Sequence, residues 1–242
     1  MSETPAIRFE AVHKSYGRVV AVRRVDLSVA PGEFVGLIGH NGAGKTTLLR
    51  MLMGVLHPTE GRVLVQGVDV HADPVEARRH MGAVPEEPAI YEYLTAREFL
   101  EFVAEVRGGG DVGAALELAG LHADADRLVR EYSQGMRRKT ALAAAVLADP
   151  AVLVLDEALN GLDPPSAARV KAHLRALVDR GTTVLLSTHV IETVQAVADR
   201  VIMLAHGRVV ADERAADLGE EGLERLFLDK LAQSVQAGSG ER

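Results

Sequence analysis

A glycine-rich loop joins an apolar segment to a helix-like segment in the first quarter of the chain. The loop follows the apolar residues 34–38, precedes the apolar-rich residues 48–52, and reads Gly39-His40-Asn41-Gly42-Ala43-Gly44-Lys45-Thr46-Thr47. Strand, glycine spacing, Lys-Thr pair and helix in this order are typical of a phosphate-binding loop. A glycine-rich turn without a ligand is the weaker interpretation, because all four features agree. The sequence predicts a nucleoside triphosphate site and restricts the fold to those that carry such a loop.

Each residue type in this loop has a physical role. The glycines permit backbone conformations that side chains forbid, so successive N–H groups can surround phosphate oxygens at the positive end of the following helix. Lys45 adds a mobile positive charge for the β and γ phosphates. The Thr46 hydroxyl suits Mg²⁺, and Thr47 is expected to bond another phosphate.

Two adjacent carboxylates end a second apolar segment. Val152-Leu153-Val154-Leu155 is followed by Asp156 and Glu157. Asp156 is expected to bind Mg²⁺ through water, and Glu157 to orient or deprotonate the water that attacks a triphosphate. Solvated acids at a strand end would be the interpretation of an isolated pair, but the loop upstream favours the catalytic one.

Two further positions are ambiguous from the residues alone. His189 follows an apolar segment at 183–186, where an open α/β sheet binds ligands at its carboxyl edge, although a lone histidine is more often structural. Ser133-Gln134-Gly135-Met136 opens an alanine-rich helix, and its donors suit an anion, although capped helix starts are common. Both interpretations of each position stay open at this level.

The order of patterns predicts the fold class. Short strands at 7–13, 25–29, 33–38 and 62–65 predict a β-rich layer around the loop. Helical patterns dominate 89–148 and include a capping box at Thr95 and Glu98. Strands and helices alternate from residue 152 onward, which favours a parallel sheet. We predict an α/β fold: a P-loop NTPase core with a mostly parallel sheet, an N-terminal antiparallel β layer and a helical subdomain inserted at about 89–148.

Composition excludes several classes of function. The chain of 242 residues has no cysteine, so disulfides and thiolate chemistry are excluded. Its formal net charge of -7 has the wrong sign for wrapping nucleic acid, so we expect no nucleic acid partner. The longest apolar run, 141–155, is interrupted by Asp149 and Pro150, and no membrane-spanning segment or signal peptide is expected.

Five motifs in a fixed order resemble the ATP-binding subunit of an ABC transporter over about residues 7–212. The loop 39–47 resembles Walker A, and Leu153 to Glu157 resembles Walker B. The other three are the signature Tyr132-Ser133-Gln134-Gly135-Met136, the D-loop Asn160-Gly161-Leu162-Asp163 and the switch histidine His189. The resemblance implies one ATPase domain at 1–212, followed at 213–242 by a short helical extension and a tail that is disordered from Gln236.

The resemblance also implies a mechanism. The cofactors would be ATP and Mg²⁺, with Tyr16 stacked on adenine, although a tyrosine packed in a loop is the alternative. Two nucleotide-binding subunits, as a homodimer or a heterodimer, would close head to tail. Ser133 and Gly135 of one would then complete the γ-phosphate site of the other, and the Asp163 region would link the two sites. Hydrolysis through Glu157 and His189 would reset the dimer.

The resemblance implies a membrane partner as well. The chain would power a separate transmembrane permease, peripherally at the cytoplasmic face of the cell membrane, with a docking groove among Ile90, Tyr91, Tyr93 and Leu94. Core packing is an equally good interpretation of these four residues. The pattern around 85–93 is more similar to exporters of the ABC-2 kind than to importers, while the cargo and the direction of transport stay open.

One departure from the family pattern concerns the metal. Glu86 in Pro85-Glu86-Glu87-Pro88 stands where many relatives carry a glutamine that touches Mg²⁺. A carboxylate remains an oxygen ligand, but its charge repels the γ-phosphate when the metal is absent. We therefore expect ATP binding to depend more strongly on Mg²⁺ than it does with glutamine at this position.

Two other functions compete with transport. An ABC-type ATPase acting on DNA or ribosomes uses the same chemistry, but such proteins generally have paired cassettes, coiled-coil insertions or zinc cysteines, and the acidic balance opposes it. A regulatory or assembly module that binds ATP without significant turnover is favoured only by Glu86 and opposed by Glu157 and His189. Phosphate release by the native chain and by Glu157→Gln distinguishes this module from an ATPase that turns over.

Overall fold

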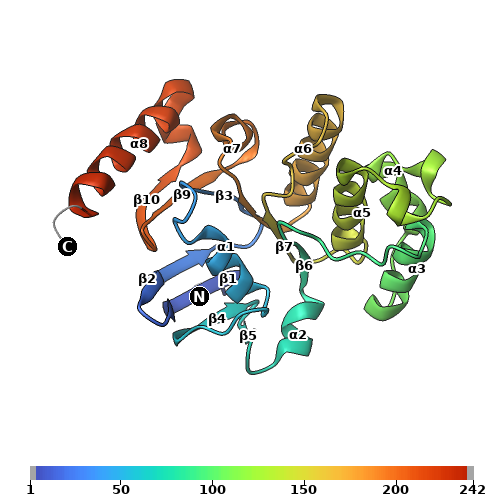
Figure 1. Cartoon of the computed structure of the whole chain (residues 1–242), viewed down its shortest axis with the longest axis horizontal. Coiled ribbons are helices and arrows are strands. Elements are labelled where there is room, and N and C mark those ends of the chain that lie inside the picture. Colours follow the sequence, from blue (N-terminus) through green and yellow to red (C-terminus); the bar gives the residue numbers. More distant parts are fainter. Residues whose placement is uncertain (1–3, 239–242) are drawn as a thin grey trace.

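Two β-sheets form the body of the molecule (Figure 1). The computed structural model describes residues 4–238. The smaller sheet is antiparallel, with the order β2-β1-β4-β5, and comprises β1 Ile7–Tyr16, β2 Val19–Val29, β4 Glu60–Val65 and β5 Val68–Asp69. The larger sheet has the order β10-β9-β3-β8-β7-β6 and comprises β3 Phe34–Ile38, β6 Met81–Val84, β7 Val152–Asp156, β8 Thr183–Ser187, β9 Arg200–Ala205 and β10 Arg208–Arg214.

The larger sheet is parallel except at one edge. β9, β3, β8, β7 and β6 pair in parallel, and β10 returns antiparallel to β9. Its helices are α1 Lys45–Leu52, α2 Pro74–Arg79, α3 Ala96–Arg107, α4 Val112–Ala119, α5 Gln134–Val146, α6 Pro164–Asp179, α7 Ile191–Val197 and α8 Ala215–Gly238. The expected α/β architecture, with an antiparallel N-terminal layer and a mostly parallel sheet, is confirmed.

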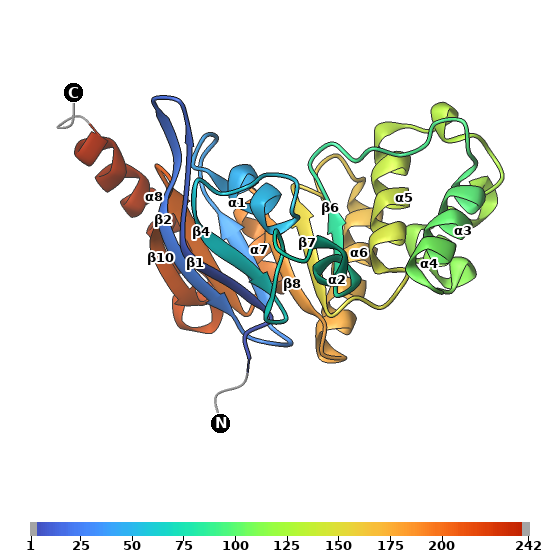
Figure 2. The same cartoon turned by 90° about the horizontal axis from the view of Figure 1, so that it is seen from below.

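The main core lies between the two sheets and contains α1. Leu48, Leu49, Met51 and Leu52 of α1 are fully buried against side chains of both sheets. Figure 2 shows α1 in the space between β4 and the larger sheet. Because β3 is buried along its whole length, the loop that follows it is held between two packed elements.

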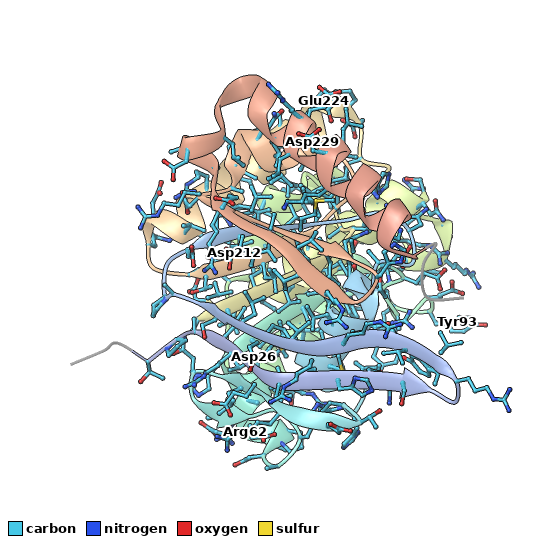
Figure 3. The ribbon with its side chains drawn as sticks, turned by 90° about the vertical axis from the view of Figure 1, so that its left-hand side faces the viewer. Asp26, Arg62, Tyr93, Asp212, Glu224 and Asp229 are labelled. Carbon is cyan, nitrogen blue, oxygen red and sulfur yellow. The ribbon has the colours of Figure 1, made fainter. Side chains whose placement is uncertain are left out.

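In the small sheet, β1 and β2 are longer than the sequence pattern predicts, and their pairing is irregular. β1 extends to Tyr16, whereas a strand ending at residue 13 was expected. β2 begins at Val19, whereas a strand beginning at residue 25 was expected. The register between them shifts after Phe9, where Ala11 has a positive φ of 47° and its N–H donates to Asp26 Oδ1 at 2.7 Å. Figure 3 shows Asp26 on this sheet, with Arg62 on β4 beyond it. Such bulges interrupt the alternation of apolar residues, which explains the short prediction.

Three elements before residue 89 were not predicted, namely the two-residue strand β5, the helix α2 and the strand β6. α2 is a single short helix, with Pro74 in its first turn and a side-chain cap from Asp73 to the Glu76 N–H. β6 contains Gly82, and a Cβ there would lie 2.0 Å from the Ala145 carbonyl oxygen. The glycine thus permits α5 to pack directly on this edge strand, while it removes the apolar signal that would have revealed the strand.

The helical region is present as predicted. The Thr95 hydroxyl and the Glu98 carboxylate form the expected capping box at the start of α3. α4 is capped by Asp111 and ends at Gly120, and both α3 and α4 pack with α5 around Leu100, Leu116 and Leu147. Figure 1 shows these helices at the opposite end of the molecule from α8.

The C-terminal helix continues further than expected. α8 runs to Gly238, so helix replaces the disorder predicted from Gln236, and residues 239–242 lie outside the described residues. Gly219 kinks it, with φ 65° and ψ -178°, and Leu223 after the kink is buried against β9 and α7. Figure 3 shows α8, with Glu224 and Asp229, beside the β10 strand that carries Asp212. The division of the chain at 212 stays a prediction.

No helix within residues 4–238 combines the length and the apolar character that a bilayer crossing requires.

Candidate nucleotide site

A cavity of about 380 Å³ lies over the glycine-rich loop. Residues from four places in the chain line it: the start of β2, the loop with the start of α1, the segment after β6, and the end of β7. They are Val19, Val20, Ala21, His40, Asn41, Gly42, Ala43, Gly44, Lys45, Thr46, Thr47, Glu86 and Glu157. The structure therefore brings Glu86 and Glu157 to the loop.

Close backbone packing fixes the shape of the loop. Gly42 and Gly44 have φ of 83° and 107°, a region that favours glycine. A Cβ on Gly44 would lie 2.6 Å from the Ala21 carbonyl oxygen, and a Cβ on Gly39 would lie 2.4 Å from the Leu204 carbonyl oxygen. Gly44 is also the N-cap of α1, and it has no side chain to cap the first N–H groups of that helix. These N–H groups and the positive end of α1 suit an anion.

Lys45 is held at the base of the cavity. Its side chain is buried, and Nζ donates to the Gly39 carbonyl oxygen at 2.7 Å and lies 3.9 Å from Glu157 Oε1. Burial lowers the pKa of Lys45, whereas the charges of Glu157, Asp156 and Glu86 act in the opposite direction. Carboxylates of the protein therefore lie near the ammonium group of Lys45. The same lysine lines the cavity, which suits an anion.

Asp156 is almost fully buried at the end of β7. Its Oδ1 accepts from Ser187 Oγ at 2.5 Å and from Thr46 Oγ1 at 3.4 Å. Burial raises the pKa of Asp156, while the two hydroxyl hydrogen bonds act to lower it. Carboxylate and hydroxyl oxygens are hard ligands, and Glu86 lines the same cavity, so Thr46, Asp156 and Glu86 fit Mg²⁺ with water completing its shell.

Glu157 has an unusual backbone and a crowded carboxylate. Its φ is 50°, and its N–H donates to Ser187, with the carbonyl oxygen at 3.1 Å and Oγ at 3.2 Å. Glu157 Oε2 accepts from Asn160 Nδ2 at 2.7 Å and lies 3.1 Å from His189 Nδ1. His189 thus contacts the carboxylate of Glu157, and Glu157 lines the cavity. A carboxylate beside an imidazole is a pair that can transfer a proton.

Other predicted residues lie apart from this cavity. Ser133 caps α5 by accepting from the Met136 N–H at 3.2 Å, and Asp163 caps α6 by accepting from the Ser166 N–H at 2.9 Å. Neither of them lines the cavity, and neither do Gln134, Gly135 and Met136. Tyr16, half exposed at the end of β1, is also outside the lining, with Lys14 Nζ 5.2 Å from its ring centroid. The nucleotide roles of these residues stay predictions.

Sequence reasoning missed three contributors. Ser187 Oγ donates to the Asp156 carboxylate and accepts from the Glu157 N–H. No motif pointed to Ser187, because its position comes from the pairing of β8 with β7. Asn160 was included only as part of a motif and not as a partner of Glu157. Val19 to Ala21 line the cavity from the small sheet, a tertiary contact without a local sequence signal.

A second, apolar groove of about 350 Å³ lies between the core and the helical region. Ile90, Phe99, Phe102 and Ala141 are among its lining residues. Beside it, Tyr91 is 59% exposed and Tyr93 is 80% exposed, while Leu94 is half-buried. Figure 3 shows Tyr93 at the margin of the molecule. Of the four residues proposed for docking, Tyr91 and Tyr93 are therefore surface residues, whereas Ile90 and Leu94 are half-buried and Ile90 packs against the core.

Comparison with known proteins gives a consistent result. The family model described as ABC transporter matches residues 22–160. The chain is 34% identical over 216 residues to the bacitracin transport ATP-binding protein BcrA of Enterococcus faecalis, a match covering 88% of this chain and 70% of that one. It is 42% identical over 214 residues to the daunorubicin resistance ATP-binding protein DrrA2 of Streptomyces coeruleorubidus, covering 86% and 66%.

Solved structures agree with the sequence relatives. An ATP-binding subunit of an ABC transporter superposes with a TM-score of 0.86 at 27% identity, covering 93% of this chain and 98% of that one. A dimeric, post-hydrolysis state of the ATP-binding cassette MJ0796 with ADP and Pi superposes with a TM-score of 0.80 at 26% identity, covering 86% and 98%.

Proposed function

The chain belongs to the ABC transporter family as an ATP-binding, ATP-hydrolysing subunit, and from this premise we propose that it drives export through a separate transmembrane permease. The observation that carries the proposal is that Lys45 and Glu157 both line the cavity above the glycine-rich loop, while Asp156 accepts a hydrogen bond from Thr46 of that loop. Binding alone needs the loop and the lysine. A buried glutamate with its own hydrogen-bond partners indicates turnover as well.

The residues in and beside the cavity have different roles in the proposed reaction. The loop N–H groups and Lys45 bind the β and γ phosphates at the start of α1. Glu157 orients the attacking water and accepts its proton. His189, whose Nδ1 lies 3.1 Å from Glu157 Oε2, would contact the γ-phosphate. The buried position of Glu157 limits the other water molecules that compete for its carboxylate.

Mg²⁺ is the proposed metal. Thr46, Asp156 and Glu86 would hold it, directly or through water. When bound, it neutralises charge that develops on the phosphates.

We propose that two nucleotide-binding subunits clasp ATP between them. Ser133 lies at the N-terminus of α5, a helix of 13 residues, and outside the cavity of its own chain. In the proposed dimer, the Ser133 hydroxyl and the Gly135 N–H serve the ATP of a second copy or of a close relative. The dimeric cassette among the structural neighbours supports this arrangement. A single subunit should then hydrolyse ATP slowly.

The permease partner is proposed from the relatives and from the groove. Relatives are named for bacitracin transport, Nod factor export and daunorubicin resistance, which favours export over import. A permease segment would dock in the groove beside Tyr91 and Tyr93. With its permease, the chain would lie at the cytoplasmic face of the cell membrane. The cargo is a property of the permease.

The test compares phosphate release by the native chain and by Glu157→Gln, over a range of protein concentrations and with the co-purified permease. Hydrolysis should rise more than linearly with protein concentration, and Glu157→Gln should hydrolyse at least about a hundredfold more slowly while it still binds ATP. Equal, negligible rates for the two proteins in the presence of the permease would favour the regulatory module instead.

A further inference from the structure

One polar chain connects the signature helix α5 to the catalytic glutamate of the same subunit. It begins at Arg138 on α5, passes through Asn160 between β7 and α6, and ends at Glu157. Arg138 Nη1 donates to the backbone oxygen of Asn160, and Asn160 Nδ2 donates to Glu157 Oε2 at 2.7 Å. Neither contact is needed to explain the binding of phosphates.

The orientation of the Asn160 amide follows from its partner. An ionised carboxylate only accepts hydrogen bonds, so the amide atom beside Glu157 Oε2 is the NH₂ group. The same oxygen faces His189 Nδ1 at 3.1 Å, and the other carboxylate oxygen lies 3.9 Å from Lys45 Nζ. Asn160 is therefore the amide donor among three groups, with His189 and Lys45, that surround the Glu157 carboxylate.

The contact between α5 and residues 160–161 is close over several atoms. A Cβ on Gly135 would lie 3.4 Å from the Gly161 carbonyl oxygen, and a Cβ on Gly161 would lie 3.5 Å from Arg138 Nη1. Gly161 also has a positive φ of 72°, a backbone conformation that favours glycine, and it lies within contact range of the Arg138 guanidinium. A displacement of the start of α5 must therefore displace Asn160.

We propose that Asn160, held by Arg138, is a positioning residue for the Glu157 carboxylate. This inference rests on the proposed function, in which Ser133 and Gly135 at the start of α5 receive the ATP that is bound by the other subunit. When α5 of one subunit contacts the ATP that is bound by the other subunit, Arg138 fixes the position of Asn160. Asn160 in turn orients Glu157, which acts on the ATP that is bound by its own subunit. The two sites of a dimer are coupled within each subunit, in addition to any contact across the interface.

Two substitutions of Asn160 distinguish positioning from packing. Asn160→Ala removes the donor and the side chain, while Asn160→Asp keeps the shape and replaces the donor by a second carboxylate. Both should lower kcat by about tenfold or more, since a hydrogen bond to a charged group is lost, and should leave KM for ATP within about twofold, because Asn160 does not line the cavity. A packing role predicts near-native activity for Asn160→Asp.

Substitution of Arg138 tests the link to α5. Arg138→Ala should lower kcat and reduce the Hill coefficient of ATP hydrolysis, and Arg138→Ala combined with Asn160→Ala should be no slower than Asn160→Ala alone. Arg97→Ala is the matched control. Arg97 forms an exposed ion pair with Asp126 in the helical region, 2.8 Å apart, and its loss should not change the rate.

The outcomes separate this inference from the function on which it rests. Thermal unfolding confirms that each variant is folded before its kinetics are compared. No hydrolysis by the native chain with its permease refutes the proposed function. Hydrolysis that depends on Glu157, together with native kcat in Asn160→Asp or additive losses in the double variant, refutes the inference alone.

Discussion

Replacement of Ser187 by alanine gives the sharpest test of how the buried carboxylates are held. Ser187 Oγ donates to Asp156 Oδ1 at 2.5 Å and accepts from the Glu157 N–H at 3.2 Å. The Glu157 N–H keeps the Ser187 backbone oxygen at 3.1 Å, so the main loss is the bond to the carboxylate. Thr46 Oγ1 also donates to that oxygen, at a longer 3.4 Å.

The magnitude follows from the charge and the burial of Asp156. A hydrogen bond to a charged group contributes about 1.5–3 kcal/mol, so Ser187→Ala should lower the free energy of unfolding by about 2 kcal/mol. For a domain of this size, that loss corresponds to a Tm lower by about 4–8 °C. The deficit should grow as the pH rises through the pKa of Asp156, because the bond stabilises the charged form and burial raises that pKa.

Calorimetry of the nucleotide-free chain measures this effect. Ser28→Ala, the same chemical change at an exposed position of β2, is the control and should shift the Tm by less than about 1 °C. A Ser187→Ala protein that melts with the control, at every pH, would show that the hydroxyl does not stabilise the Asp156 carboxylate.

Three further predictions concern the metal, a helix cap and a buried histidine. Glu86→Gln should bind ATP with a weaker dependence on Mg²⁺ than the native chain, and superimposable Mg²⁺ titrations with a fluorescent nucleotide would contradict the expected repulsion. Thr95→Ala should lower the free energy of unfolding by about 1 kcal/mol because the α3 capping box is lost, whereas Thr95→Ser should melt as the native chain does. Burial, aided by His57, lowers the pKa of His71 below its ordinary 6.5, so stability is retained above pH 6.5 and lost as the pH falls through the folded-state pKa. His71→Gln should therefore flatten the decline of Tm with acid, and an unchanged slope would assign the decline to other groups.

Local sequence signals were sufficient for the loop and for most elements. The Thr95 capping box, the Gly120 helix stop and the turn at Gly207 each have a specific residue requirement that can be read from a few positions. The strand with Gly82 was missed because the residue that permits close packing of α5 also breaks the apolar pattern. The extent of β1 was missed because its bulges disturb the alternation of apolar and polar side chains.

The candidate site was predictable where it is continuous in sequence. The nine-residue loop and the Asp156-Glu157 pair are such segments, and the structure places them in one region. Ser187 was not predictable, because it meets Asp156 only through the pairing of β7 with β8, in a register that sets these two residues opposite each other. Strand order depends on how the whole chain packs and leaves no mark on the residues near one strand.

The backbone contacts beneath the loop determine when its conformational entropy is lost. Gly39 rests against the carbonyl oxygen of Leu204, and Gly44 rests against that of Ala21, so both contacts are made by the backbone of the chain itself. The chain therefore orders this segment when it folds and not when the nucleotide arrives. Nucleotide binding then requires little reorganisation of the loop. In the proposed dimer, the free energy of phosphate binding is therefore available for bringing the two subunits together.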